Sequence, residues 1–141
     1  MKGRGKNMRV AYAALLWVLV VPVQAQQSNS ITLACNGTSK LAMAAADVKP
    51  DPITNMGIIV NVADRSVTFM DFVTPLTGIS ATLVSFNGRQ TPVALGVKGK
   101  PFTIDGSIDR VTGHAEVAWW YEDVGNNTYW ELTCRPATRL F

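Results

Sequence analysis

Side chains that could perform acid–base or nucleophilic chemistry are few in this chain. His114 is the only histidine, and Asp109 precedes it at a spacing that places the two across the mouth of a predicted hairpin. An Asp–His pair can act as a base and its orienting group, but hydrolysis by this route also needs a nucleophile. The chain contains neither Gly-x-Ser-x-Gly nor His-Glu-x-x-His. We therefore interpret the pair as a cross-strand surface contact and predict that the protein is not an enzyme.

Metal and cofactor chemistry is not predicted either. Two cysteines and one histidine are too few for a zinc site built from His and Cys ligands in the usual number. The acidic residues lack the spacing of a calcium-binding loop. Lys98-Gly99-Lys100 lacks the strand and helix that flank a phosphate-binding loop. The sequence thus predicts no metal site and no cofactor.

Aromatic residues near the C-terminal end are the strongest candidates for binding. Trp119, Trp120 and Tyr121 are consecutive, and Tyr129 and Trp130 follow closely. Adjacent residues of a strand point to opposite faces, so Trp119 and Trp130 are expected in the core. Trp120 and Tyr129 then lie opposite each other on the outer face, where they bind a partner, stabilise the hairpin as a cross-strand pair, or form a second small core under a loop. With their polar neighbours, the predicted binding surface comprises Thr103, Trp120, Tyr129 and Glu131.

The N-terminal residues 1–25 have the pattern of a secretory signal peptide. A basic start precedes an uncharged apolar run over 10–21, which Pro22 ends, and Val23-Gln24-Ala25 resembles a cleavage site. Twelve apolar residues would form a helix of roughly 18 Å, which is short of the ~30 Å hydrocarbon core of a bilayer. We therefore predict cleavage after Ala25 and a single mature domain over 26–141, periplasmic or secreted, which does not span a membrane.

The net charge of +3 arises from the predicted signal peptide. Four of the 13 basic residues lie in the first nine positions, which leaves 9 basic against 10 acidic residues from Gln26 onward. The mature domain therefore carries a net charge of −1 and lacks the basic surface of a nucleic-acid-binding protein.

Export also affects the interpretation of the two cysteines. In an oxidising compartment, one pair per chain most simply forms one disulfide, here between Cys35 and Cys134. Two free thiols are the alternative. The disulfide would connect the first and last strands and so favours a closed sheet.

The residue pattern of the mature chain predicts short β-strands separated by turn residues. Only 40–48, which is rich in alanine, permits a short helix or turn. The spacing predicts an all-β fold: a small closed antiparallel barrel or a sandwich of seven to nine short strands. The expected strands are 31–35, 57–62, 66–72, 79–86, 102–109, 114–121 and 128–134, with weaker candidates at 41–45 and 92–97.

Three C-terminal strands can be tested for consistent pairing. If the loops are 110–113 and 122–127, Ile104 faces Trp119, and Trp119 faces Trp130. A two-residue slip would keep the same faces. A similar loop at 63–66 pairs Val62 with Val67. The predicted inner face carries Ile104, Ile108, Ala115, Val117, Trp119, Trp130, Leu132 and Cys134. The predicted outer face carries Asp105, Ser107, Asp109, His114, Glu116, Glu131, Thr133 and Arg135.

Several short motifs resemble those of a group of small exported bacterial proteins of unknown function. They are the early Leu33-Ala34-Cys35-Asn36-Gly37, the stretch from Gly106 to Gly113 (GSIDRVTG) and a C-terminal stretch that contains Leu132-Thr133-Cys134-Arg135-Pro136-Ala137 and ends Arg139-Leu140-Phe141. The resemblance covers most of the mature chain. It implies export, a Cys35–Cys134 pair and a β fold, and it carries over no catalytic residue.

Taken together, these features predict an exported, non-enzymatic β protein that binds an unknown protein or glycan or associates with the cell envelope. Two other functions stay open. A hydrolase would need carboxylates that the fold brings together, and a carrier of the lipocalin type would need an apolar cavity inside the barrel.

Overall fold

The computed structural model describes residues 29–43, 45, 47–94, 97–122 and 127–138. The predicted signal peptide, residues 1–25, lies outside this part of the chain. The strands are β1 (Ser30–Leu41), β2 (Asp51–Asn61), β3 (Ser66–Phe69), β4 (Phe72–Ile79), β5 (Leu83–Gln90), β6 (Val93–Ala94), β7 (Val97–Lys98), β8 (Phe102–Asp109), β9 (His114–Tyr121) and β10 (Asn127–Pro136).

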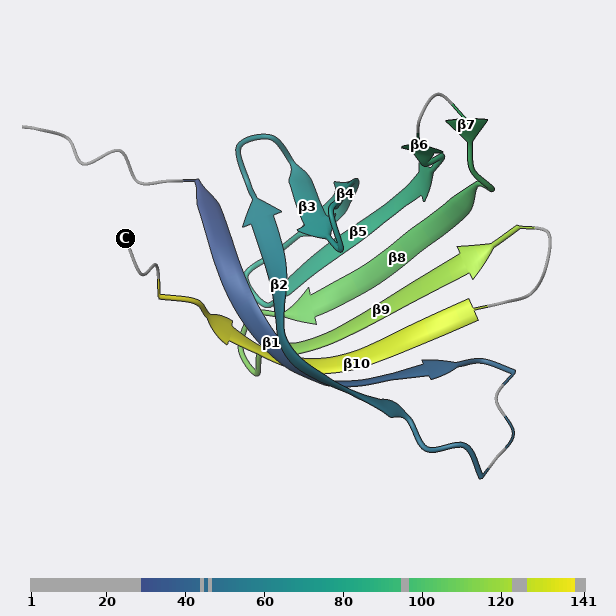
Figure 1. Cartoon of the computed structure of the whole chain (residues 1–141). Helices are drawn as coiled ribbons and strands as arrows, with labels where there is room; N and C mark the ends of the chain where they lie inside the picture. The colour runs from purple at the N-terminus through teal and green to yellow at the C-terminus, as the bar shows by residue number, and fades with distance from the viewer. Residues whose placement is uncertain (1–28, 44, 46, 95–96, 123–126, 139–141) are drawn as a thin grey trace, which may run out of the picture.

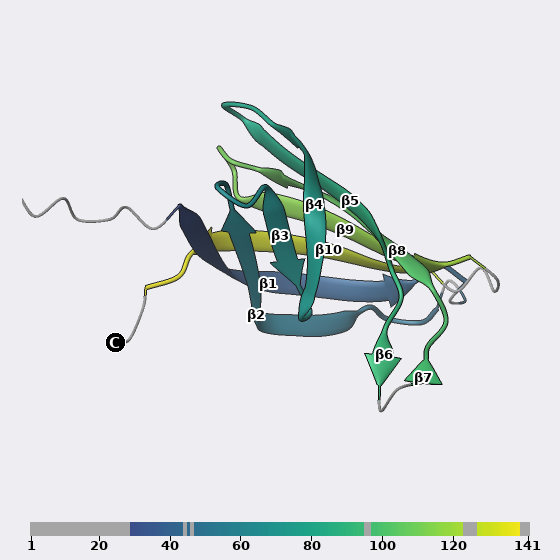
Figure 2. The ribbon, with the colours of Figure 1, turned by 90° about the horizontal axis from the view of Figure 1, so that it is seen from above.

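Eight of these strands close into an antiparallel barrel, in the order β1-β10-β9-β8-β5-β4-β3-β2 (Figure 1). The strands β6 and β7 form a separate small hairpin between β5 and β8. Seen from above, the β2–β3, β4–β5 and β8–β9 turns lie at one end of the barrel and the β6–β7 hairpin at the other (Figure 2). The predicted all-β fold is confirmed, and the barrel rather than the sandwich is the architecture.

Some predicted elements were placed wrongly. The predicted strand over 79–86 contains the turn between β4 and β5, and the predicted strand over 66–72 contains the turn between β3 and β4. The latter turn has Met70 and Asp71 at positive φ, a conformation in which glycine or asparagine is usual. Methionine does not signal a turn and no glycine accompanies Asp71, so the sequence pattern does not predict a separate β4. The stretch 40–48 contains the end of β1 and turns rather than a helix in its described residues.

Apolar side chains fill the interior of the barrel. The contact between Gly106 and Phe86 shows how closely the interior is packed: a Cβ at Gly106 would clash with Phe86 Cζ, so the phenyl ring occupies the space that glycine leaves. Such a core supplies most of the favourable free energy of folding. The largest fully buried side chains are Phe69, Phe86, Phe102, Ile58, Ile104, Leu132, Val67, Thr74 and Cys35.

The pairing of β8 with β9 is as predicted, with Ile104 opposite Trp119 and Ile108 opposite Ala115. The other two predicted registers are wrong by two residues. Trp130 pairs with Val117 rather than Trp119, and Val67 pairs with Val60 rather than Val62. A two-residue slip leaves every side chain on the same face of the sheet, so the assignment of residues to the inner and outer faces is still correct.

A disulfide joins Cys35 of β1 to Cys134 of β10, and the two residues are direct register partners. Both cysteines are buried in the core. The bond therefore lies across the seam where the first and last strands meet, as predicted from the sequence. It closes a loop with a sequence separation of 99 residues, so it strongly restricts the unfolded chain.

Candidate binding surface

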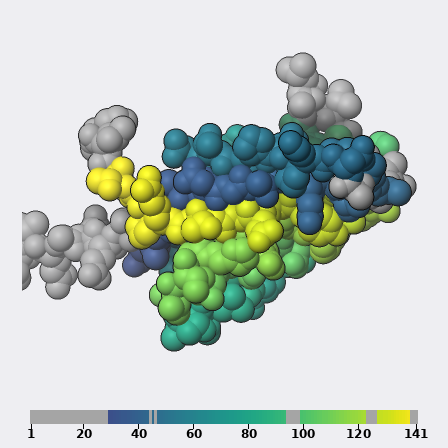
Figure 3. Space-filling model, turned by 90° about the horizontal axis from the view of Figure 1, so that it is seen from below, coloured from purple at the N-terminus to yellow at the C-terminus, as the bar shows by residue number. Residues whose placement is uncertain are grey.

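A hollow of about 650 Å³ lies on the outer face of the barrel. Its lining residues come from six neighbouring strands, from β1 through β10, β9, β8 and β5 to β4, together with Pro50 just before β2. Figure 3 views the molecule from the side where β1, β10 and β9 lie next to one another. The volume of the hollow is within the usual range of ligand sites.

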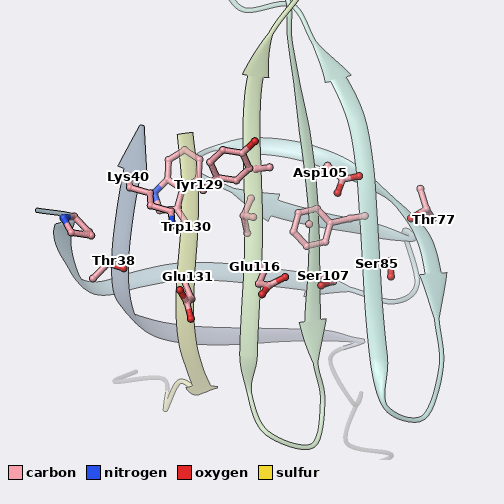
Figure 4. Close-up of a pocket in the computed structure, with 15 residues that line it drawn as sticks. Thr38, Lys40, Thr77, Ser85, Asp105, Ser107, Glu116, Tyr129, Trp130 and Glu131 are labelled. Carbon is pink, nitrogen blue, oxygen red and sulfur yellow. The ribbon is translucent and has the colours of Figure 1, made fainter. Parts of the chain in front are cut away.

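Strand register arranges the lining side chains in two rows across the sheet (Figure 4). Residues directly opposite one another on neighbouring strands form each row, and alternation places both rows on the face opposite the core. We call them the lower and upper rows. The lower row is Thr38, Glu131, Glu116, Ser107 and Ser85. The upper row is Lys40, Tyr129, Ala118 and Asp105, and Asn87 continues it on β5 outside the lining of the hollow.

Short side chains lie beside the carboxylates of Asp105 and Glu116 in the middle of the hollow. Ser85, Ser107 and Ala118 supply small groups on β5, β8 and β9. Tyr129 of β10 is 38% exposed and lies with Lys40 at one end, while Thr77 of β4 lies at the other (Figure 4).

The charge of the hollow is negative. Asp105, Glu116 and Glu131 contribute carboxylates, and Lys40 contributes the lining cation. Asn87 Nδ2 donates a hydrogen bond of 2.6 Å to Asp105 Oδ2. Glu116 and Glu131 face each other directly, and like charges in that position destabilise a sheet.

Of the predicted binding residues, Tyr129 and Glu131 line the hollow, but Thr103 and Trp120 do not. Thr103 pairs with Trp120 in the next outward row along β8 and β9, and both are partly buried. Trp120 lies opposite Asn127 rather than Tyr129, so the predicted aromatic pair is wrong, by the same two-residue slip.

The aromatic residues of the predicted core are not equally buried. Trp130 is buried, whereas Trp119 is partly buried and packs on the core from the end of the barrel. Trp119 stacks on Phe102, with ring centroids 4.0 Å apart. Trp119 lies two residues from the end of β9 and stays partly exposed, which alternation alone did not predict.

Asp109 and His114 do not form a base–orienter pair. Asp109 Oδ1 accepts hydrogen bonds from the backbone N–H groups of Val111 and Thr112, at 2.8 and 2.9 Å. The hydrogen bond from Thr112, followed by that from Val111, lowers the pKa of Asp109. His114 Nε2 lies 3.3 Å from Glu116 Oε1 instead. Asp109 therefore stabilises the β8–β9 turn, where Gly113 adopts a positive φ of 77°.

A second, smaller hollow of about 340 Å³ lies where β2 and β3 separate. Met56 and Ile59 of β2 line it together with Met70 at the β3–β4 turn. It is mainly apolar and lacks the polar rows of the larger hollow.

Several residues of the larger hollow were not singled out in the sequence. Thr38, Lys40 and Ser85 reach it only because β1 and β5 join the sheet beside β10 and β8. The available signal was the outward phase of Asp105, Ser107 and Glu116, which the predicted outer face already contained.

In the described part of the chain, no three His, Cys, Asp or Glu side chains are grouped so that they could hold a metal ion. The same residues include no helix of the length and apolarity needed to cross a bilayer. Comparison with protein-family models, curated proteins and solved structures finds no match.

Proposed function

We propose that the protein is an exported, non-enzymatic binding protein whose ligand is a glycan held in the larger hollow. One observation carries the proposal: a concave outer sheet face combines an exposed tyrosine with hydroxyl and carboxylate side chains. Carboxylates accept hydrogen bonds from sugar hydroxyls, and serine and threonine both donate and accept them. An aromatic ring offers an apolar face for stacking against the C–H face of a sugar.

The polarity of the hollow favours a glycan over a folded protein partner. The centre of a protein–protein interface is usually apolar and depleted of charge. Here the central strands β8 and β9 present Asp105 and Glu116 instead. The filled interior of the barrel likewise supports binding outside rather than the carrier function of a lipocalin.

Export is part of the same proposal. The signal-like pattern of residues 1–25 supports it, and a disulfide is typical of proteins that fold in an oxidising compartment. Cell fractionation tests it. The protein should appear outside the cytoplasm with its N-terminus at Gln26, whereas cytoplasmic protein that retains residues 1–25 would contradict export.

The binding proposal is tested on a glycan array with the mature, oxidised protein. Tyr129→Ala should weaken binding at least about tenfold, because exposed aromatic anchors carry a large share of binding energy. Trp120→Ala tests the patch predicted from the sequence, and Val111→Ala is a control at an exposed apolar residue outside the hollow. If no glycan binds, or if Tyr129→Ala binds like the parent, the proposal fails.

Hydrolysis is a second candidate, because Glu116 and Glu131 are register partners. Side chains directly opposite have Cβ atoms about 4.5–5.5 Å apart, so two glutamates there can bring their carboxyl groups to the roughly 5–5.5 Å separation that retaining glycosidases use. However, the Glu116 side chain is 71% exposed, so it lacks the buried environment that distinguishes the general acid of a glycosidase from its partner carboxylate. New reducing ends that form with the parent but not with Glu116→Gln would establish hydrolysis.

A further inference from the structure

We infer, on the basis of the proposed function, that the ligand is a linear oligosaccharide without acidic groups that lies across the strands. The length and the charge of this ligand both follow from the residues that line the hollow.

The length follows from the number of strands that line the hollow. From Thr38 and Lys40 on β1 to Thr77 on β4, the lining spans six neighbouring strands (Figure 4). Five strand spacings of about 4.7–4.9 Å amount to roughly 24 Å along the sheet. A monosaccharide would fill a small part of that distance, whereas a chain of several sugars would contact both ends.

The direction of the ligand follows from the two rows. Along the lower row, polar groups succeed one another at the strand spacing, so a chain laid across the strands meets a new hydrogen-bonding side chain at each strand. In the upper row, Ala118 of β9 interrupts the series of polar groups. The lower row offers Glu131, Glu116, Ser107 and Ser85 in succession. A chain laid along β9 would instead pass from Glu116 to Ala118 and then leave the hollow.

The charge of the ligand follows from the lining. The hollow contains three carboxylates and a single lysine, and that lysine is at one end. A chain of uronic acids would place its own carboxylates against Glu116 and Glu131, which already face each other. Juxtaposed like charges oppose binding, so the surface selects against polyanions.

Calorimetric titration with N-acetylglucosamine oligomers of one to six units tests the length. The hexamer should bind at least about tenfold more tightly than the dimer, since two or three additional hydrogen bonds of ordinary net strength supply that factor. Equal affinity for the dimer and the hexamer would overturn the inference and leave the binding proposal intact. Failure of every oligomer to bind here, together with an empty glycan array, would overturn both.

A pair of matched variants locates the far end of the ligand. Thr77→Gln lengthens an exposed side chain on β4 and should weaken binding of the hexamer but not of the dimer. Thr82→Gln makes the same change at an exposed position in the β4–β5 turn and should leave both unchanged. If Thr77→Gln affects neither oligomer, the ligand does not reach β4 and the inferred length is wrong.

Oligogalacturonate tests the charge. The parent should bind it at least about tenfold more weakly than the neutral hexamer, and the double variant Glu116→Gln/Glu131→Gln should reduce that difference. Equal binding of both oligomers by the parent would overturn the selection against acidic chains.

Discussion

The two faces of β8, β9 and β10 are built from alternate residues of the same strands, yet they have different physical tasks. The inner face places Ile104, Val117 and Trp130 in a packed core. The outer face places carboxylates and short polar side chains around a hollow. The core tolerates little change in volume, whereas the outer face contributes little to folding. Substitutions on neighbouring residues should therefore separate stability from binding.

The largest effect is expected at Trp130 on the inner face. Trp130→Ala should lower the free energy of unfolding by about 3–5 kcal/mol, because a large buried side chain is lost and a cavity remains. Urea denaturation measures the change. Its neighbour Tyr129 points to the other face, and Tyr129→Ala should change stability by roughly 1 kcal/mol or less. Similar decreases in the free energy of unfolding for the two variants would contradict the assignment of Trp130 to the core and Tyr129 to the outer surface.

Removal of the disulfide should have the next largest effect. The double variant Cys35→Ala/Cys134→Ala should lose about 2–5 kcal/mol, because the unfolded chain regains the freedom of a long loop. Reduction of the parent should approach the same stability, provided that a denaturant gives the reductant access to the buried sulfurs. An unchanged melting temperature would show that the strand pairing alone holds the seam.

Gly106 tests how closely the inner face is packed. Gly106→Ala should cost about 1–3 kcal/mol by overpacking, since the added methyl would lie against the Phe86 ring. Phe86→Leu introduced into that variant should recover part of the loss, which a double-mutant cycle would detect. If the effects of the two changes are additive, the contact with Phe86 is not the cause of the stability loss in Gly106→Ala.

The smallest effect concerns pH and the β8–β9 turn. The turn holds the pKa of Asp109 below its ordinary value of 3.8, so ionised Asp109 contributes stability above that value. The contribution is lost as the pH falls through the lowered pKa. Asp109→Asn keeps the acceptor oxygen but not the charge. The difference in melting temperature between the parent and this variant should therefore shrink below about pH 4. A difference that is constant from pH 7 to pH 2 would contradict this role.

The predictable part of the fold follows from local patterns. Strand alternation identified both faces of β8, β9 and β10, and the turn at Gly113 set the β8–β9 register. The longer connection between β9 and β10 permits registers that differ by two residues. Both registers bury the same side chains, so the hydrophobic pattern could not choose between them.

The larger hollow depended on non-local pairing. Tyr129 and Glu131 were predicted from their outward phase, but Lys40 and Thr77 join them only when the barrel closes through β1 and β4. The shape of the hollow depends on which short side chains become neighbours across strands. That information is absent from any single strand.

Binding in the larger hollow is tested most directly by an NMR titration of the ¹⁵N-labelled mature protein with the N-acetylglucosamine hexamer. The largest amide shift changes are expected at outward residues of the hollow, among them Glu116 and Glu131, with small changes at buried residues far from it such as Ile58 and Val67. Changes centred on the second hollow, near Met56 and Met70, would contradict the assignment of the binding face. A spectrum unchanged at saturating hexamer, with the array also empty, would contradict glycan binding itself.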